Sequence, residues 1–271
     1  MNSNVDYHLH TYYSDGSMSP TEIVKRAKKM EYIEIAITDH DGIDGVKEAQ
    51  IAGKALDINV MSGIELSAKY ESEEFPEEIS LHILGYRIDI KNKELLAALA
   101  DIREKRKERN EKLLRALADM GYELNDEDLY FSDEQDYLGK PLIARALVKR
   151  GFINHAKEAF EEGNFLEAPE IKKIRKEKIS FEEAIKLIKG AGGIPVLAHP
   201  MKIKGIGERG SGEFFENLDK ILRKLKIAGL SGLECYHSNH TEEEALKMVE
   251  YAEKYHLHIT QGSDYHGPEF E

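Results

Sequence analysis

Short apolar segments along this chain alternate with helix-like segments, and most of them end next to a histidine or a carboxylate. The pattern predicts helices at 21–30, 45–56, 181–189, 216–227 and 241–255, and strands at 5–10, 33–38, 59–65, 79–86, 193–198, 232–236 and 258–263. Such alternation is typical of a parallel sheet with helices outside it. Seven strands favour a (β/α)-barrel-like α/β fold over an open doubly wound sheet.

Residues 92–178 interrupt this alternation with long, charged helices. Leu95, Leu99 and Ile102 form an apolar stripe that continues through Leu113 and Leu117. A polar, turn-like stretch at 131–137 and a further helix ending at 151 follow. We therefore predict a barrel domain made of 1–91 and 179–271, with a helical insertion at 92–178.

Composition limits the possible settings of this chain. Its 271 residues, 41% of them hydrophobic, are enough to bury a large core. The net charge of −13 argues against a surface that coats nucleic acid. Cys235 is the only cysteine, which excludes an intramolecular disulfide. The absence of a signal-peptide core or a membrane-length apolar stretch predicts a cytoplasmic protein without a membrane partner.

Two His-x-His pairs occur, although roughly 0.4 would be expected by chance from 11 histidines in 271 residues. Residues two apart on a strand face the same side, so His8 and His10 point together from the carboxyl end of the first strand. Barrel enzymes build their sites at that end. His256 and His258 begin the last strand, about 20 Å from its other end, and are predicted to be structural.

Further ligand-type residues follow the other strands. His40, Glu65 and His199 come after apolar runs, and Asp264 and His266 repeat the two-residue spacing at the end of the last strand. His82 is the exception, because it lies in the middle of its predicted strand. Since the carboxyl ends of the strands meet at one barrel mouth, these residues predict a single polynuclear metal centre.

The segments HLHTYYSDG, ITDHDG, GIELS, HILGY, AHP and GSDYHG, in this order, resemble the motif series of the PHP (polymerase and histidinol phosphatase) family. They are most similar to its stand-alone metal-dependent phosphoesterases, which carry a helical insertion at the same place. The resemblance covers nearly the whole chain. It implies a distorted (β/α)7 TIM-like barrel with two or three divalent ions at its mouth.

The resemblance also implies a ligand set. His8, His10, Glu65 and Asp264 would hold one ion, and Glu65 would bridge to a second ion. The complete set is His8, His10 and Asp264 with bridging Glu65 for the first ion, His82 and His199 for the second, and Asp15, His40 and His266 for the third. Nitrogen and oxygen ligands without a thiolate suit Mn, Fe or Zn alike.

Clustered divalent ions favour hydrolysis of a phosphate ester, because they activate water and share the charge of the phosphoryl oxygens. The hypothesis is hydrolysis of phosphomonoesters by a metal-bridging hydroxide, with Asp264 in the catalytic centre. His40 or His266 would protonate the leaving group if the third ion is absent, and a metal-bound water would do so if it is present. Asp39 and Asp41 are expected to orient His40 and its neighbours.

Candidate substrate contacts are Lys202 and Lys204 after His199, and His240 before the last helix; His237 looks incidental. The segment GKPLIARAL resembles a GRPHIARAL-like segment that lies over the site in relatives. Lys140 and Leu142 replace the Arg and His of that segment, whereas Arg145 is retained. Loss of a bidentate Arg weakens the case for nucleotide specificity carried over from relatives.

Several functions fit this sequence. The leading hypothesis is a phosphatase for nucleotide 3′-phosphates, such as nucleoside 3′,5′-bisphosphates, or for short oligonucleotides. Histidinol-phosphate phosphatase is the closest alternative, a non-catalytic metal-binding PHP scaffold is an alternative of another class, and C–N hydrolysis ranks lowest. The partner is then a phosphorylated small molecule or nucleotide.

The basic segment 103–112 raises the question of nucleic-acid binding. Its interleaved glutamates predict a solvated helix face, although one edge could bind a second phosphate. No stable nucleic-acid complex is expected.

Overall fold

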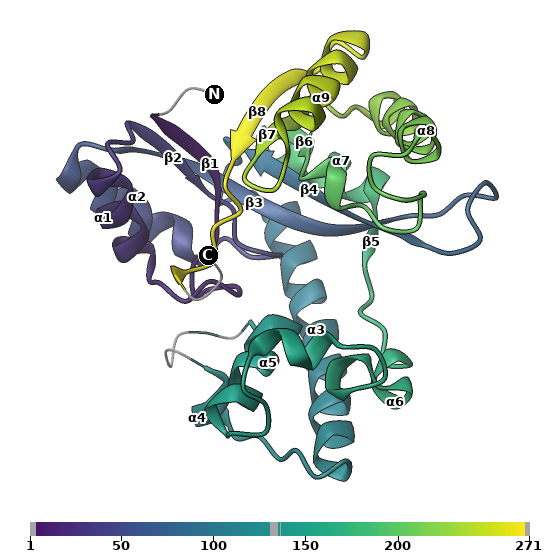
Figure 1. Ribbon diagram of the computed structural model, residues 1–271. Coiled ribbons are helices and arrows are strands. Elements are labelled where there is room, and N and C mark those ends of the chain that lie inside the picture. Colours follow the sequence, from purple (N-terminus) through teal and green to yellow (C-terminus); the bar gives the residue numbers. More distant parts are fainter. Residues whose placement is uncertain (1–3, 131–134, 136, 269–271) are drawn as a thin grey trace.

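The computed structural model describes residues 4–130, 135 and 137–268, so most of the turn predicted at 131–137 lies outside the described residues. A single sheet organises the fold (Figure 1). Its strands follow one another in the order β1 (Val5–Leu9), β2 (Glu34–Ile37), β3 (Asn59–Tyr70), β4 (Ile79–Tyr86), β6 (Ile194–Leu197), β7 (Gly232–His237) and β8 (His258–Gly262). The short β5 (Ile179–Ser180) pairs with β3 outside this path.

The last strand returns beside the first, where Leu9 and Tyr265 form a parallel bridge. Gln261 Nε2 also donates a hydrogen bond to the Val5 carbonyl (2.9 Å). The seven strands therefore form a nearly closed barrel, which confirms the predicted α/β barrel-like class.

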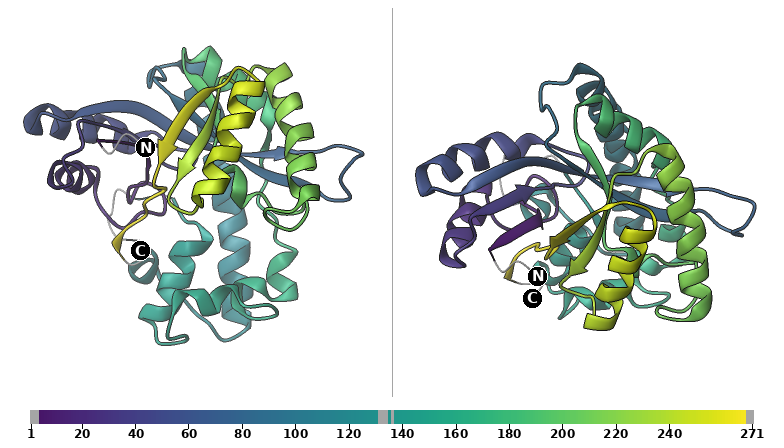
Figure 2. Two further views of the ribbon diagram at one scale, coloured as in Figure 1. Left: turned by 45° about the horizontal axis from the view of Figure 1, so that its top comes forward. Right: turned by 90° about the horizontal axis from the view of Figure 1, so that it is seen from above.

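Helices cover the outside of this barrel. They are α1 (Pro20–Lys29), α2 (Asp44–Leu56), α7 (Phe181–Gly190), α8 (Gly212–Ala228) and α9 (Glu242–Lys254). Figure 2 shows the purple N-terminal helices on one side of the strands and the green and yellow C-terminal helices on the other. As predicted, α1 starts after Ser19, whose Oγ accepts a hydrogen bond from the Glu22 N–H, with Pro20 in the first turn.

The prediction of a wholly parallel sheet is wrong at β4. This strand runs antiparallel to both β3 and β6. No helix lies between β3 and β4, so the chain turns back directly through residues 71–78 instead of crossing over. Ser67 is opposite His82 in this pairing. The reversal explains why His82 is not at the carboxyl end of its strand.

The strand β3 is also longer than predicted and continues to Tyr70. Glu65 is therefore in the middle of a strand rather than at its end. It still lies level with the barrel mouth, because β2 ends at Ile37 and His40 then forms an isolated bridge with Glu65.

The segment between β4 and β5 is helical. It contains the 27-residue α3 (Lys93–Asp119), α4 (Asp126–Leu129), α5 (Lys140–Lys149) and α6 (Pro169–Lys172), with 3-10 helices η1 (Ala156–Phe160) and η2 (Phe165–Glu167). Figure 1 shows these helices together on one side of the sheet. They share an apolar cluster of their own that includes Leu117, Leu142 and Leu147. The division into a barrel and an inserted domain at 92 and 178 stays a prediction.

No helix within the described ranges is long and apolar enough to cross a membrane.

The first half of α3 anchors the helical segment to the barrel. Leu99 is 3% exposed and belongs to the barrel core, whereas Leu96 on the same helix is 43% exposed. We expect Leu99→Ala to lower the free energy of unfolding by about 2–5 kcal/mol, because it leaves a cavity. Urea denaturation followed by circular dichroism measures this change. The matched control Leu96→Ala should change it by less than about 1 kcal/mol; equal effects would contradict the anchoring role.

Candidate metal centre

His8 and His10 are fully buried at the carboxyl end of β1, and both rings face Glu65. His8 Nε2 lies 3.3 Å and His10 Nε2 3.2 Å from Glu65 Oε2. The same nitrogens lie 3.3 and 3.2 Å from Asp264 Oδ1, which follows β8. These four residues form a group whose ligand atoms all lie within 4.8 Å of one another. It is the same set that the resemblance implies for the first ion.

The two oxygens of Glu65 face different groups of histidines. His82 Nδ1 and His199 Nε2 each lie 3.0 Å from Oε1, and 3.2 Å from each other. On the other side, His40 Nδ1 lies 3.0 Å from Oε2. His40, Glu65 and His82 form a second group with metal-ligand spacing. The Glu65 carboxylate therefore lies between two sets of ligand-type side chains.

A third group surrounds Asp15. His266 Nε2 lies 3.2 Å from Asp15 Oδ1, and His40 Nε2 lies 3.7 Å from Asp15 Oδ2. His10 completes this group through its Nδ1, 3.8 Å from Asp15 Oδ1. The structure thus brings all nine predicted ligands to one place. His10, His40 and Glu65 each take part in two groups, and in the second group His40 stands where the resemblance implies His199.

Buried polar atoms without hydrogen-bond partners indicate that these residues are suited to bind divalent cations. Buried polar atoms normally have a partner, yet several atoms that point into this centre have none: His8 Nε2, His10 Nε2, Asp15 Oδ1, His40 Nδ1 and Glu65 Oε2. Imidazole nitrogens and carboxylate oxygens that converge without a shared hydrogen are ligands suited to Mn, Fe or Zn.

Burial and charge act against each other in this cluster. Burial raises the pKa of Glu65, but His40 and His8 outweigh it and hold that pKa well below its usual range. Burial lowers the pKa of His40 to about 3, because Glu65 and Asp15 offset only part of the desolvation. Burial also lowers the pKa of His10, but Asp264 and Glu65 more than compensate and raise it to about 10. His40 is therefore neutral near pH 7 and presents a lone pair.

The backbone is strained at three positions around the centre. Asp41, His199 and Asp264 have φ angles of 50°, 27° and 58°, in the left-handed region that non-glycine residues rarely adopt. His199 and Asp264 are predicted metal ligands, and Asp41 follows the predicted ligand His40. Such strain persists where the surrounding structure enforces it, and it clusters at functional sites.

The sequence analysis missed Glu234, a fully buried carboxylate on β7. Its Oε1 lies 2.9 Å from His8 Nδ1, and its Oε2 accepts a hydrogen bond from the His199 N–H (2.7 Å). It thereby directs His8 Nε2 into the centre. A Cβ at Gly262 would lie 2.2 Å from His8 Cβ and 2.7 Å from Glu234 Oε1, so only glycine fits there. A glutamate in the apolar strand GLECYH was the available signal.

His237, which the sequence analysis treated as incidental, lies at the centre. It is 1% exposed, and its Nε2 is 3.5 Å from Asp264 Oδ2. The Asn239 N–H donates to His237 Nδ1 (3.0 Å), so Nε2 carries the hydrogen and faces the carboxylate. The earlier interpretation was wrong, because β7 extends to His237 and ends beside the metal ligands.

Asp39 and Asp41 lie where orienting residues are expected. Asp39 accepts hydrogen bonds from the Thr11 N–H (2.7 Å) and from Ser14 Oγ (2.6 Å), which itself is 3.3 Å from His10 Nδ1. Asp39 therefore fixes the loop after β1.

Asp41 binds the helical segment instead. Its Oδ2 accepts from Arg106 Nη2 (2.6 Å) and Lys176 Nζ (2.9 Å), and its Oδ1 accepts from the Ser67 N–H (2.7 Å). Burial raises the pKa of Asp41, but Lys176 and Arg106 outweigh it and hold that pKa below its usual range. The sequence analysis missed both cations.

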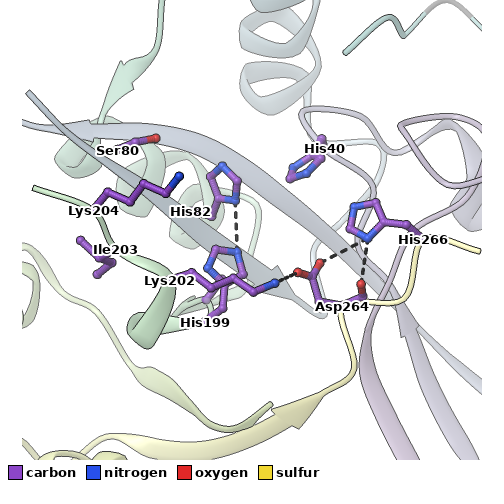
Figure 3. Close-up of a pocket in the computed structure, with 10 residues that line it drawn as sticks. His40, Ser80, His82, His199, Lys202, Ile203, Lys204, Asp264 and His266 are labelled. Atoms are coloured by element: carbon purple, nitrogen blue, oxygen red, sulfur yellow. Dashed lines mark hydrogen bonds and ion pairs between the residues drawn. The ribbon is translucent and has the colours of Figure 1, made fainter. Parts of the chain in front are cut away.

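A cavity of about 360 Å³ opens on the centre (Figure 3). Its lining includes His82, His199, Lys202, Lys204 and His266. Lys202, at the end of η3 (Pro200–Lys202), donates to Asp264 Oδ2 (2.6 Å). A second cavity of about 570 Å³ shares Lys202, Asp264 and His266 with the first. The metal centre therefore lies where two cavities meet.

The other predicted substrate contacts differ in position. Arg145 Nη2 donates to the Asp15 carbonyl (2.8 Å), at the edge of the third ligand group. Lys140 donates instead to the Leu166 carbonyl (2.9 Å) and to Glu167 Oε1 (3.3 Å), and it lines neither cavity. His240 bonds through Nδ1 to the Cys235 carbonyl (2.9 Å) and packs against the His237 ring, also outside both cavities. The positions of Lys140 and His240 thus do not support direct substrate contact.

His256 and His258 are exposed at the other end of β8, where His258 pairs with Gly232 at the start of β7.

The model of the PHP domain matches residues 6–162, more than half of the chain. The chain belongs to the PHP family. This match and the fold confirm the family resemblance drawn from the motifs.

Curated relatives cover almost the whole of this PHP chain. A 3′,5′-nucleoside bisphosphate phosphatase from Chromobacterium violaceum is 29% identical over 98% of this chain and 88% of its own length. A 5′-3′ exoribonuclease from Haemophilus influenzae is also 29% identical, over 99% of this chain and 92% of its own. Among solved structures, an amidohydrolase from C. violaceum with bound sulfate superposes with a TM-score of 0.85 at 28% identity, covering 98% of this chain and 88% of that one.

Glu234 offers a test of the centre that does not depend on activity. We expect Glu234→Gln to weaken divalent metal binding by about 10- to 100-fold, because the His8 ring loses its charged partner. Competition with a chromophoric chelator measures the affinity. The control His258→Gln, exposed at the other end of β8, should leave it unchanged; loss of metal there would contradict the location of the centre.

Proposed function

We propose that this PHP protein is a metal-dependent phosphoesterase that hydrolyses phosphomonoesters, with nucleotide 3′-phosphates or short oligonucleotides as its substrates. The observation that carries the proposal is the bridging position of Glu65. Its two oxygens face separate groups of histidines, and the orphaned nitrogens around it point to one place. Ions that share a carboxylate are suited to displacement at phosphorus.

When bound, the divalent ions would lower the pKa of water and neutralise the charge of the phosphoryl group. The chain supplies the geometry for this chemistry. Glu234 holds the ring of His8 in place before any substrate arrives. Asp39 likewise holds the loop that follows His10. This fixed arrangement lowers the reorganisation that the reaction requires.

Lys202 is the cation best placed to meet the substrate. Its Nζ lies at the junction of both cavities, next to Asp264, where an ammonium can neutralise a phosphoryl oxygen. If the third ion is absent, His40 or His266 would protonate the leaving group, and a metal-bound water would do so if it is present. His266 Nδ1 bonds to the Asp264 carbonyl (2.8 Å), which holds its ring toward Asp15.

Two observations support a nucleotide substrate. The relatives named above act on a nucleoside bisphosphate and on RNA. In addition, the two cavities that share Lys202, Asp264 and His266 leave room for further groups attached to a phosphate. Histidinol phosphate remains the alternative substrate. The non-catalytic alternative is less well supported, since none of the nine predicted ligands is missing.

Removal of the bridging carboxylate tests the activity. We expect Glu65→Ala to lose bound metal and to lower phosphatase turnover at least about 1000-fold, because both ions lose a shared ligand. Elemental analysis and phosphate release should be measured on the same sample with three substrates: an aryl phosphate, histidinol phosphate and a nucleoside 3′,5′-bisphosphate.

Preferential turnover of the bisphosphate supports the proposal, whereas preference for histidinol phosphate supports the alternative. Metal-loaded wild-type protein that releases no phosphate from any of the three would favour the scaffold role. Turnover that persists in the metal-free Glu65→Ala variant would overturn the mechanism.

A further inference from the structure

A second cleft lies in the helical segment, outside the cavities of the metal centre. It has a volume of about 390 Å³ and lies between α3 and the chain that follows α6. Its lining consists of Lys105, Glu108, Arg109, Lys112, Lys173, Ile174, Arg175 and Glu177. Nothing in the catalytic proposal uses these residues.

The charge of this cleft is opposite to that of the protein. Five basic and two acidic side chains line it, a net charge of +3 in a chain whose net charge is −13. Lys105, Arg109 and Lys112 are spaced by four and three residues on α3, so they share one helix face. A positive cleft on an acidic protein concentrates anions locally.

Within the described part of the chain, most of these cations form no ion pair. Lys105 pairs with Asp101 (3.0 Å) and Glu177 (3.5 Å). Within residues 4–130, 135 and 137–268, no ion pair is formed by the side chains of Arg109, Lys112, Lys173 or Arg175. Arg109 Nε is buried without a hydrogen bond, and burial lowers the pKa of this residue. Arg109 is half-buried, and a guanidinium whose inner nitrogen lacks a partner and that has no carboxylate beside it is suited to bind an anion from outside.

Two cations next in sequence to the cleft lining contact the loop beside the metal centre. Arg106 follows Lys105 on α3, and Lys176 follows Arg175. Both contact Asp41, the residue after His40. Arg109 is about 5 Å along the helix axis from Arg106, and Lys112 about as far again. The spacing of these cations is on the scale of one nucleotide.

We propose that this cleft binds the backbone phosphates of a short single-stranded oligonucleotide whose terminal phosphate lies at the metal centre. The inference rests on the proposed function and, of the two substrate classes named there, selects short oligonucleotides over mononucleotides. It also modifies the expectation for segment 103–112. Glutamates do pair along this helix, as Arg115 does with Glu111, but Arg109 and Lys112 face the cleft.

Dependence on substrate length tests the proposal. The variant Arg109→Gln/Lys112→Gln/Arg175→Gln removes three cations from the cleft. We expect its KM for a five-nucleotide RNA to rise about tenfold with kcat unchanged, because distal phosphate contacts are lost. The KM for a nucleoside 3′,5′-bisphosphate should rise less than about twofold. Equal changes for both substrates, or none, would overturn the proposal.

The control variant Lys107→Gln/Arg115→Gln/Lys224→Gln removes the same charge from exposed positions outside the cleft. It should leave the KM ratio of the two substrates at the wild-type value. If it raises the ratio as much as the cleft variant does, the effect is one of net charge and the proposal fails. The conservative Arg109→Lys/Arg175→Lys variant should restore most of the affinity and shows that the fold tolerates changes there.

Direct binding separates this inference from the proposed function. Fluorescence anisotropy of a labelled five-nucleotide RNA with metal-stripped protein requires no turnover. The slope of log K against log salt concentration should flatten by about 2 in the triple cleft variant, or about 0.7 for each lost phosphate contact. If the RNA binds through the cleft but no phosphate ester is hydrolysed, the cleft stands and the enzymatic proposal fails. An unchanged slope overturns the cleft.

Discussion

The carboxylate of Glu65 has no exposed surface and lies within 3.3 Å of nitrogen atoms from five histidines. A buried charge of this kind costs several kcal/mol unless positive charge compensates it. Burial holds His40 neutral, so its ring offers a lone pair, whereas the raised pKa of His10 gives that ring a positive charge beside Glu65. Divalent cations between the carboxylate and the rings would supply this compensation in place of protons.

The direction of β4 determines which residues can reach this carboxylate. Because β4 runs antiparallel, the side chain of His82 approaches Glu65 from the neighbouring strand, in register with Ser67. A parallel strand would need a crossover helix on this side of the barrel. The hairpin removes that helix, and the long α3 emerges after β4 instead. The reversal thus supplies a candidate metal ligand and also leaves one face of the barrel mouth open to the helical segment.

Much of the fold and most of the candidate ligands could be predicted from the sequence. The spacing of apolar residues and the residue types that follow a strand are local properties of the chain. The strand at 79–86 is found with its predicted limits. Strand direction is not local, so the antiparallel β4 was missed. Glu234 was missed because its hydrogen bonds reach residues 226 and 35 positions away. Arg106 continues the buried stripe of α3 after Ile102, and a charge at that position was the signal to follow.

Asp41 links the metal centre to the helical segment. Its backbone follows His40, and its side chain holds Arg106 from α3 and Lys176 from the chain after α6. These two contacts tie α3 and the chain after α6 to the residue that follows a candidate metal ligand, and Asp41 itself has a left-handed backbone (φ 50°). The position of the helical segment and the geometry of His40 are therefore coupled by one carboxylate.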